Sequence, residues 1–168
     1  MDKPLVLLET SSGDILLELF PDKAPETVKN FLQYVDDGFY AKTIFHRVIK
    51  GFMIQGGGLT LRLEEKATRP PVINEAANGL KNVRGSLAMA RTAAPHSAAA
   101  QFFINTVDNP ELDFTSADDT GFGYCVFGQV ADGMDVVDAI EKGKVKAQGE
   151  HEALPVDSVL IVSAGRFE

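Results

Sequence analysis

The sequence predicts a mostly antiparallel β-barrel with two helices that cover its ends. Short apolar or alternating segments recur along the chain, and glycine-rich connections separate them. This pattern favours a barrel or a sandwich over an α/β layer fold. Two further segments have the spacing of amphipathic helices. Since the chain has no internal repeat and no low-complexity stretch, we expect one domain over Pro4 to Phe167.

The chain opens with a predicted β-hairpin. Leu5–Leu8 is an apolar run, and Ile15–Phe20 is an alternating one. Between them stands Ser11-Ser12-Gly13-Asp14, and glycine beside aspartate between two such runs is a turn signal.

The first helix follows this hairpin. Asp22 is a candidate N-cap, Pro25 suits a first turn, and Glu26 favours the positive end of the helix dipole. Gly38 is a natural stop. The helix has one apolar stripe at i, i+3, i+4 and i+7, made of Val28, Phe31, Leu32 and Val35.

The middle of the chain reads as short strands joined by long, irregular loops. The predicted strands are Thr43–Ile49, Phe52–Gln55, Gly85–Ala90, Gln101–Asn105 and Tyr124–Val130. The predicted loops are Gly56–Asn82, Arg91–Ala100 and Val107–Gly123.

A second, shorter helix and a last strand complete the prediction. The helix starts at Asp132 or Gly133 and contains Met134, Val137 and Ile140. A polar loop over Lys142–Leu154 then leads to a strand over Pro155–Ser163.

Charge and hydropathy exclude two classes of partner. The formal net charge is −8, from 24 acidic and 16 basic residues, and there is no cluster of five or more Lys and Arg residues. Nucleic acid is therefore not an expected partner. The longest apolar runs are far shorter than the ~20 residues of a membrane helix, so no membrane partner is expected either.

Residues for cofactor or metal chemistry are missing. The one cysteine, Cys125, excludes an intramolecular disulfide and fits a reducing compartment. Gly56-Gly57-Gly58 lacks the lysine and spacing of a phosphate loop, and His46, His96 and His151 are scattered along the chain. We expect no cofactor and no metal. The opening residues lack the long apolar segment of a signal peptide, so the expected location is the cytoplasm. Nothing in the sequence resembles a helical seam or a sticky edge, so the expected state is a monomer.

Polar and aromatic side chains gather on the predicted strands. Strict alternation puts Phe45 and Arg47 on one face and His46 on the other. The same alternation puts Met53 and Gln55 on one face of the next strand, and a bend at Gly51 would bring Phe52 beside them. By the same rule Gln101 and Phe103 share a face opposite Phe102. The pattern alone indicates a barrel wall with a few exposed aromatic residues.

Five segments in order resemble the cyclophilin family of peptidyl-prolyl cis–trans isomerases. They are Phe45–Ile49, Gly51–Gly57, Leu87–Ala90, Gln101–Ile104 and Val126–Gly128. Ala24–Phe31 and Gly133–Val137 are similar to the two helices of the family, and Ala90-Arg91-Thr92 with Pro95-His96-Ser97 resembles its small bacterial cytoplasmic branch. The resemblance covers nearly the whole chain. It implies an eight-stranded antiparallel barrel capped by two helices.

The resemblance also implies a site. Arg47 matches the catalytic arginine of the family. The pocket for the substrate proline ring is matched by Phe52, Met53, Phe103 and Leu112. Gln55 and Gln101 match polar groups beside the pocket, and Ala90 and Arg91 match the peptide groove. The implied partners are proline-containing peptides and unfolded or folding polypeptides.

Two positions depart from the family pattern. Many members have a tryptophan where this chain has Glu111, so cyclosporin is expected to bind weakly. Many have a histidine where this chain has Tyr124, which still offers a ring and a hydroxyl beside the pocket. For His46, next to Arg47, we expect a hydrogen-bonded supporting role.

The reaction needs these residue types and no cofactor. Rotation about an amide is opposed by ~18–20 kcal/mol, and the twisted state has a localised lone pair on the prolyl nitrogen. The guanidinium of Arg47 can donate to that nitrogen when the bond twists. Two alternatives stay open: a proline-peptide binding module or holdase that lacks turnover, and a small-molecule barrel. The large residues Phe31, Phe102, Phe103 and Phe127 argue against the latter. The role of His96 also stays open.

Overall fold

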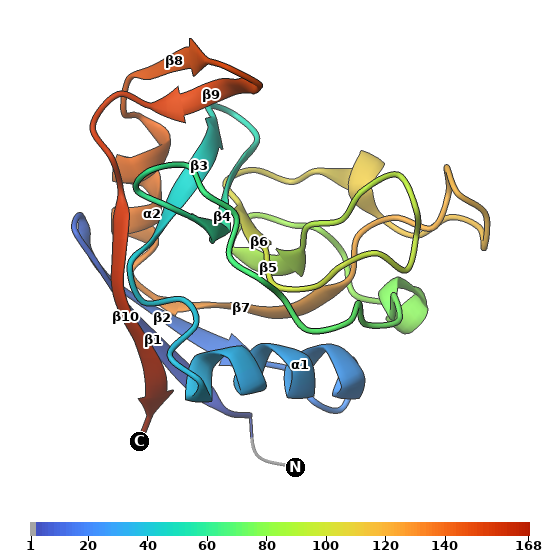
Figure 1. Ribbon diagram of the computed structural model, residues 1–168. Helices are drawn as coiled ribbons and strands as arrows, with labels where there is room; N and C mark the ends of the chain where they lie inside the picture. The colour runs from blue at the N-terminus through green and yellow to red at the C-terminus, as the bar shows by residue number, and fades with distance from the viewer. Residues whose placement is uncertain (1–2) are drawn as a thin grey trace.

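The computed structural model describes residues 3–168, and eight strands form a closed barrel in the order β1-β10-β3-β4-β6-β5-β7-β2 (Figure 1). All neighbouring pairs are antiparallel. The barrel strands are β1 (Leu5–Thr10), β2 (Gly13–Leu19), β3 (Thr43–Ile49), β4 (Met53–Thr60), β5 (Ser86–Met89), β6 (Phe102–Asn105), β7 (Val126–Asp132) and β10 (Leu160–Phe167). Two helices, α1 (Pro25–Asp36) and α2 (Met134–Glu141), cap this barrel, so the predicted fold class is confirmed.

Large side chains fill the barrel. The apolar stripe of α1 is buried in the same cluster as the inward-facing strand residues, and Val137 and Ile140 of α2 join it. Phe31 packs against Phe102 and Phe127, with ring centroids 5.7 and 5.1 Å apart. Because aromatic side chains fill the interior of the barrel, a ligand site has to lie on its outside.

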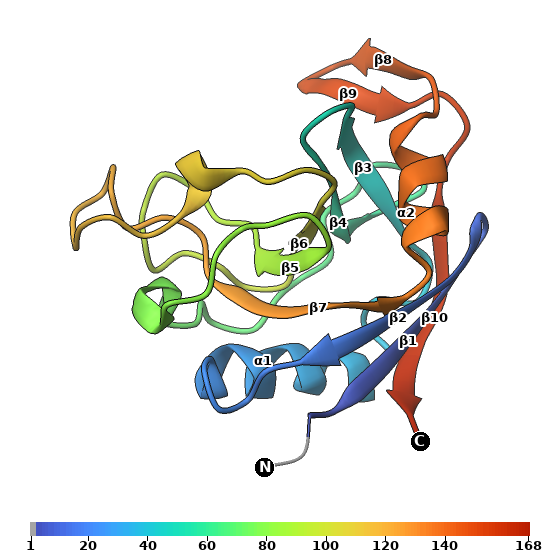
Figure 2. The same cartoon turned by 180° about the vertical axis from the view of Figure 1, so that it is seen from behind.

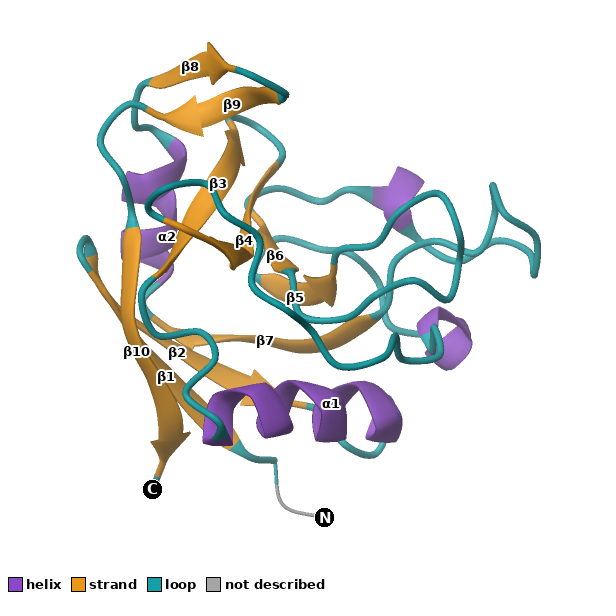
Figure 3. Ribbon diagram, in the orientation of Figure 1, coloured by secondary structure: helices purple, strands orange, loops and turns teal. Residues whose placement is uncertain are grey.

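The long loops and two short 3₁₀ turns, at Ala76–Asn78 and Pro110–Leu112, lie together on one side of the molecule (Figure 3). The view from behind shows the same grouping, with β1, β2 and β10 on the opposite side (Figure 2). In residues 3–168, none of the helices has the length and apolar character needed to cross a bilayer.

The first turn of α1 has a partner that the sequence did not reveal. Asp22 is not its N-cap, because the helix begins at Pro25 after Ala24, and no side chain caps it locally. Instead, Glu75 accepts hydrogen bonds from the Thr27 amide (2.7 Å) and hydroxyl (2.7 Å) and from the Glu26 amide (3.3 Å). The negative charge of this carboxylate also interacts favourably with the positive N-terminal end of the helix dipole. A loop residue far along the chain therefore replaces a local cap.

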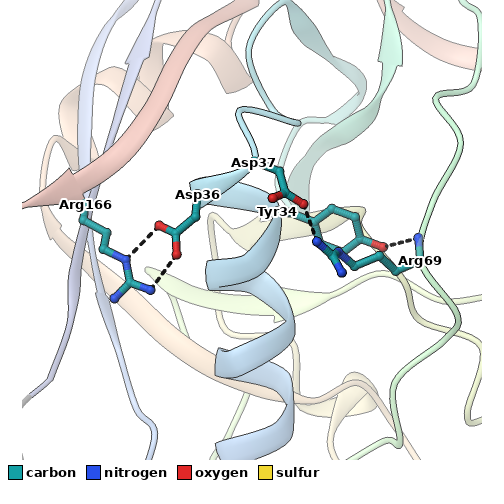
Figure 4. Close-up of polar contacts among 5 residues, drawn as sticks. All are labelled: Tyr34, Asp36, Asp37, Arg69 and Arg166. Atoms are coloured by element: carbon teal, nitrogen blue, oxygen red, sulfur yellow. Dashed lines mark hydrogen bonds and ion pairs between the residues drawn. The ribbon is translucent and has the colours of Figure 1, made fainter.

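The other end of α1 stops as predicted and is tied to two distant segments. Gly38 adopts φ +72°, and its amide donates to the carbonyl of Val35. Asp36 forms a two-pronged ion pair with Arg166 of β10, at 2.8 Å for both contacts (Figure 4). Asp37 pairs with Arg69, whose backbone amide also donates to the Tyr34 hydroxyl. The guanidinium of Arg166 lowers the pKa of Asp36.

Three predicted boundaries are wrong, two of them near the C-terminus and one at the end of β4. The expected loop over Lys142–Leu154 contains a two-stranded sheet of β8 (Val145–Gln148) and β9 (His151–Pro155). Every residue of β8 is exposed, so the short Val-Lys-Ala-Gln alternation marks no buried face, and four residues are too few to distinguish a strand from a loop. The last strand begins at Leu160 rather than at Pro155. Strand β4 continues to Thr60, through glycines that were assigned to a loop.

Candidate active site

A pocket of about 130 Å³ opens on the outer side of the barrel, where β3, β4 and β6 meet the long loops. Every residue carried over from the family resemblance lines it, except Gln101 and His46. The lining residues are Arg47, Phe52, Met53, Gln55, Ala90, Arg91, Phe103, Leu112 and Tyr124.

The floor of the pocket is apolar and separate from the barrel core. Met53 and Phe103 are buried there with Ala88 and Val126, in a cluster of their own. The ring of Tyr124 meets Phe103 edge to face, with centroids 5.7 Å apart. A ligand ring placed here would exchange water for aromatic and thioether surface.

Arg47 reaches the pocket because of an irregularity in β3. Phe45 pairs with Gly56, but Arg47 pairs with Gln55, so β3 carries one extra residue at this point. Phe45 is fully buried in the core, whereas Arg47 is exposed on the outside. The prediction that these two residues share a face is wrong, because the bulge breaks the alternation.

Alternation holds in the two neighbouring strands. Met53 and Gln55 of β4 both line the pocket, while Ile54 between them is buried in the barrel core. In β6, Phe103 faces the pocket and Phe102 faces the core. These strands run without an extra residue between them, so the period of two decides which side chains reach the ligand.

A chain of side-chain hydrogen bonds leads away from Arg47. Its Nη1 donates to Gln55 Oε1 (3.2 Å), and Gln55 Nε2 donates to Gln101 Oε1 (3.0 Å). Gln101 itself lies in a second pocket of about 250 Å³, which shares Gln55, Ala90 and Arg91 with the first. Gln55, itself held by Gln101, thus holds the guanidinium through one of its nitrogens, while Arg47 lines the pocket.

Comparisons with known proteins agree with this geometry. A profile of the family "Cyclophilin type peptidyl-prolyl cis-trans isomerase/CLD" matches residues 5–166. The chain belongs to this family. It is 58% identical to peptidyl-prolyl cis-trans isomerase B of Escherichia coli K12, over 95% of this chain and 97% of the relative. It is 55% identical to peptidyl-prolyl cis-trans isomerase cyp18 of Streptomyces antibioticus, over 95% and 96%.

Solved cyclophilins share the fold. A cyclophilin-type isomerase of Cryptosporidium parvum superposes with a TM-score of 0.79 at 30% identity, over 99% of this chain and 98% of the other. The same protein in the presence of the dipeptide Ala-Pro gives a TM-score of 0.78 at 30% identity, over 98% and 99%. The barrel and the enzyme class expected from the sequence, a peptidyl-prolyl isomerase, are therefore confirmed.

A buried asparagine network supports the cyclophilin pocket from behind, and sequence reasoning missed it. Asn109 Nδ2 donates to the carbonyl of Phe52 (2.9 Å) and to Asn105 Oδ1 (2.7 Å). Asn105 Nδ2 donates in turn to Asn82 Oδ1 (3.1 Å) and to Ser86 Oγ (2.8 Å). The network fixes the bend that carries Phe52. The only sequence signal was an asparagine that ends an otherwise apolar strand.

Gly58 offers a way to disturb the glutamine chain alone. A Cβ at this position would lie 2.5 Å from Gln101 Cγ and 2.6 Å from its Nε2. Gly58→Ala should therefore displace Gln101, and one lost hydrogen bond of ~0.5–1.5 kcal/mol corresponds to a fall in kcat/KM of about 2- to 12-fold. Gly165→Ala is the control variant, because a Cβ at this position meets nothing within 4 Å, and it should keep the wild-type kcat/KM for the same peptide. Equal activities of the two variants would show that Gln101 does not support Arg47.

His46 differs from the expectation in one respect. Its side chain is only 7% exposed, and within residues 3–168 its Nδ1 is buried without a hydrogen-bond partner. The expected hydrogen-bonded role is wrong for this atom. The ring instead lies edge-on to His151 of β9, with centroids 5.9 Å apart. Burial, with smaller contributions from the charges of His151 and Arg47, lowers the pKa of His46 to about 4.

This low pKa makes folding stability depend on pH. Between its ordinary pKa of about 6.5 and the folded value of about 4, His46 is protonated in the unfolded chain but neutral in the folded one. Stability should fall as the pH falls through this window, by ~2.5 kcal/mol between pH 7 and pH 4.5. Urea unfolding of the wild type and His46→Gln at both pH values isolates this contribution, since carboxylates titrate in both proteins. The same pH dependence in both would contradict it.

Proposed function

We propose that the isomerase activity of this chain is carried by Arg47 at the edge of the apolar pocket, and that it acts on Xaa–Pro bonds in peptides and in folding polypeptides. The observation that carries the proposal is the placement of an exposed guanidinium beside a buried aromatic and thioether surface. No ion pair involving Arg47 occurs within residues 3–168, so its charge is available to a ligand.

The mechanism follows from what changes when the amide twists. In the planar bond the prolyl nitrogen shares its lone pair with the carbonyl and is a poor acceptor. In the twisted bond that lone pair is localised, and a donor from Arg47 stabilises it selectively, with each ~1.36 kcal/mol giving a tenfold rate increase. The pocket holds the ring still while the preceding carbonyl turns, and it excludes water that would weaken the contact.

Binding of a proline-containing ligand has independent support. The Cryptosporidium parvum relative has been solved in the presence of Ala-Pro, and this chain shares its fold over nearly its whole length. We assign the proline ring to the surface made by Phe52, Met53, Phe103 and Leu112. Because Glu111 stands where many cyclophilins have a tryptophan, we propose that cyclosporin binds weakly.

We also propose that the protein acts as a monomer in the cytoplasm. The free thiol of Cys125 is buried, and burial raises its pKa to about 11, which suits an unreactive cysteine in a reducing compartment.

Exchange spectroscopy on an Ala-Pro tetrapeptide separates an isomerase from a binding module or holdase. An isomerase should give exchange cross-peaks between cis and trans signals at catalytic amounts of protein, since uncatalysed exchange takes tens to hundreds of seconds. Line broadening of both forms without cross-peaks would mean binding without turnover and would overturn the proposal.

A further inference from the structure

Arg91 lies at the junction of the proline pocket and the second pocket, and it lines both. Building on the proposed function, we infer that Arg91 is a specificity-determining residue that selects substrates with an acidic side chain two residues before the proline.

The guanidinium of Arg91 is held rigidly, and only by neutral groups. Its Nε donates to the carbonyl of Gly123 (2.9 Å), and its Nη1 donates to those of Thr92 (2.8 Å) and Ala93 (3.3 Å). Its Cζ lies 4.6 Å from the ring centroid of Tyr124. Within the described part of the chain, Arg91 has no carboxylate partner, and its Nη2 has no acceptor. A pre-organised cation with a free donor is a site for an anionic group.

The other charged side chains along the two pockets do not neutralise the positive charge of Arg91. Lys66 also lines the second pocket, but its Nζ donates to the carbonyl of Phe39 and lies 4.6 Å from the Phe39 ring centroid. Among the described residues, Glu65 is the one carboxylate on the wall of the second pocket, and it is exposed to solvent. Arg47 adds a positive charge to the first pocket. The groove formed by the two adjoining pockets is thus cationic, although the whole chain carries a net charge of −8.

The direction of the substrate follows from the position of Arg47. If Arg47 donates to the prolyl nitrogen of the substrate, the substrate residue before the proline leaves the proline pocket on the side of Arg47 and Gln55. Gln55 also borders the second pocket, so the chain before the proline runs toward it. In an extended peptide, residues two apart point to the same side. The side chain two positions before the proline therefore enters the second pocket beside Arg91.

The test compares two peptides that differ only in charge at that position, one with Glu-Ala-Pro and one with Gln-Ala-Pro, at pH 7 and low salt. In the wild type, kcat/KM should be about three- to fivefold higher for the Glu peptide, as for a partly exposed ion pair. This ratio should fall to about one in Arg91→Gln and should decrease with added salt. Because both peptides are measured on one protein, the ratio does not depend on how much of a variant folds.

Arg62→Gln is the matched control, since Arg62 is exposed and lines neither pocket, and it should keep the wild-type ratio. Equal rates for the two peptides in the wild type would overturn the inference while leaving the proposed function intact. A preference that survives in Arg91→Gln would overturn the assignment to this residue. No turnover of either peptide would instead mean that the proposed function itself fails.

Discussion

Arg47→Ala should lower kcat/KM for an Ala-Pro tetrapeptide by at least ~100-fold, which corresponds to about 2.7 kcal/mol of transition-state stabilisation. The contact that it removes forms only when the prolyl nitrogen leaves conjugation, so the loss should appear mainly in kcat. Arg47 is exposed, and within residues 3–168 its one side-chain hydrogen bond goes to Gln55, so folding stability should change little. A protease-free isomerisation assay with parallel urea unfolding measures both quantities.

Arg47→Lys sharpens this test. Lysine keeps the positive charge but loses the planar fork that holds Gln55 with one nitrogen while others face the substrate. It should recover only a small part of the lost activity. Full activity in either variant would show that Arg47 does not stabilise the twisted bond, and the binding surface alone would then have to explain catalysis.

Phe102→Ala should destabilise the protein by about 3–5 kcal/mol, which is a large part of the stability of a domain this size. Phe102 is fully buried, and its ring packs edge to face against Phe31, Tyr40 and Phe45. The cavity would open inside the barrel and not at the ligand pocket. Activity per folded molecule should therefore stay within a few-fold of the wild type.

The adjacent residue gives the opposite result. Phe103→Ala removes the surface that faces the proline ring, and the loss of ~1.5–3 kcal/mol of apolar contact should lower kcat/KM by about one to two orders of magnitude. Urea unfolding and turnover of both variants, corrected for the folded fraction, test the pair. If Phe102→Ala lowers intrinsic activity as much as Phe103→Ala does, the separation between core and pocket is wrong.

Local patterns predicted most of the fold. The apolar spacing of α1 identified its buried stripe, and alternation in β4 and β6 assigned Met53, Gln55 and Phe103 to the side that the pocket occupies. These predictions depend only on the period of each element and on which face is buried. The family resemblance then added Arg91, Leu112 and Tyr124, which lie outside the helices and strands, Leu112 in a 3₁₀ turn, so strand alternation does not place them.

Three of the wrong predictions share a cause, because each depends on contacts between distant segments. The bulge in β3 is defined by its pairing with β4, and so the face of Arg47 cannot be read from β3 alone. The cap of α1 comes from Glu75 rather than from nearby Asp22. Strand β9 is held on β3 by Leu154, which packs with Ile44. None of these contacts leaves a signal in its own stretch of sequence.

The distant cap also affects the order in which the chain acquires structure during synthesis. Glu75 lies 48 residues beyond Thr27, so the amides at the start of α1 have no protein acceptor until that stretch has been translated. At ~5–20 residues per second, the delay is roughly two to ten seconds. Isolated helices of this length are marginal in water, and α1 therefore stays frayed on the emerging chain. The cap therefore couples the first turn of α1 to the loop that carries Glu75, and each stabilises the other once both have been translated.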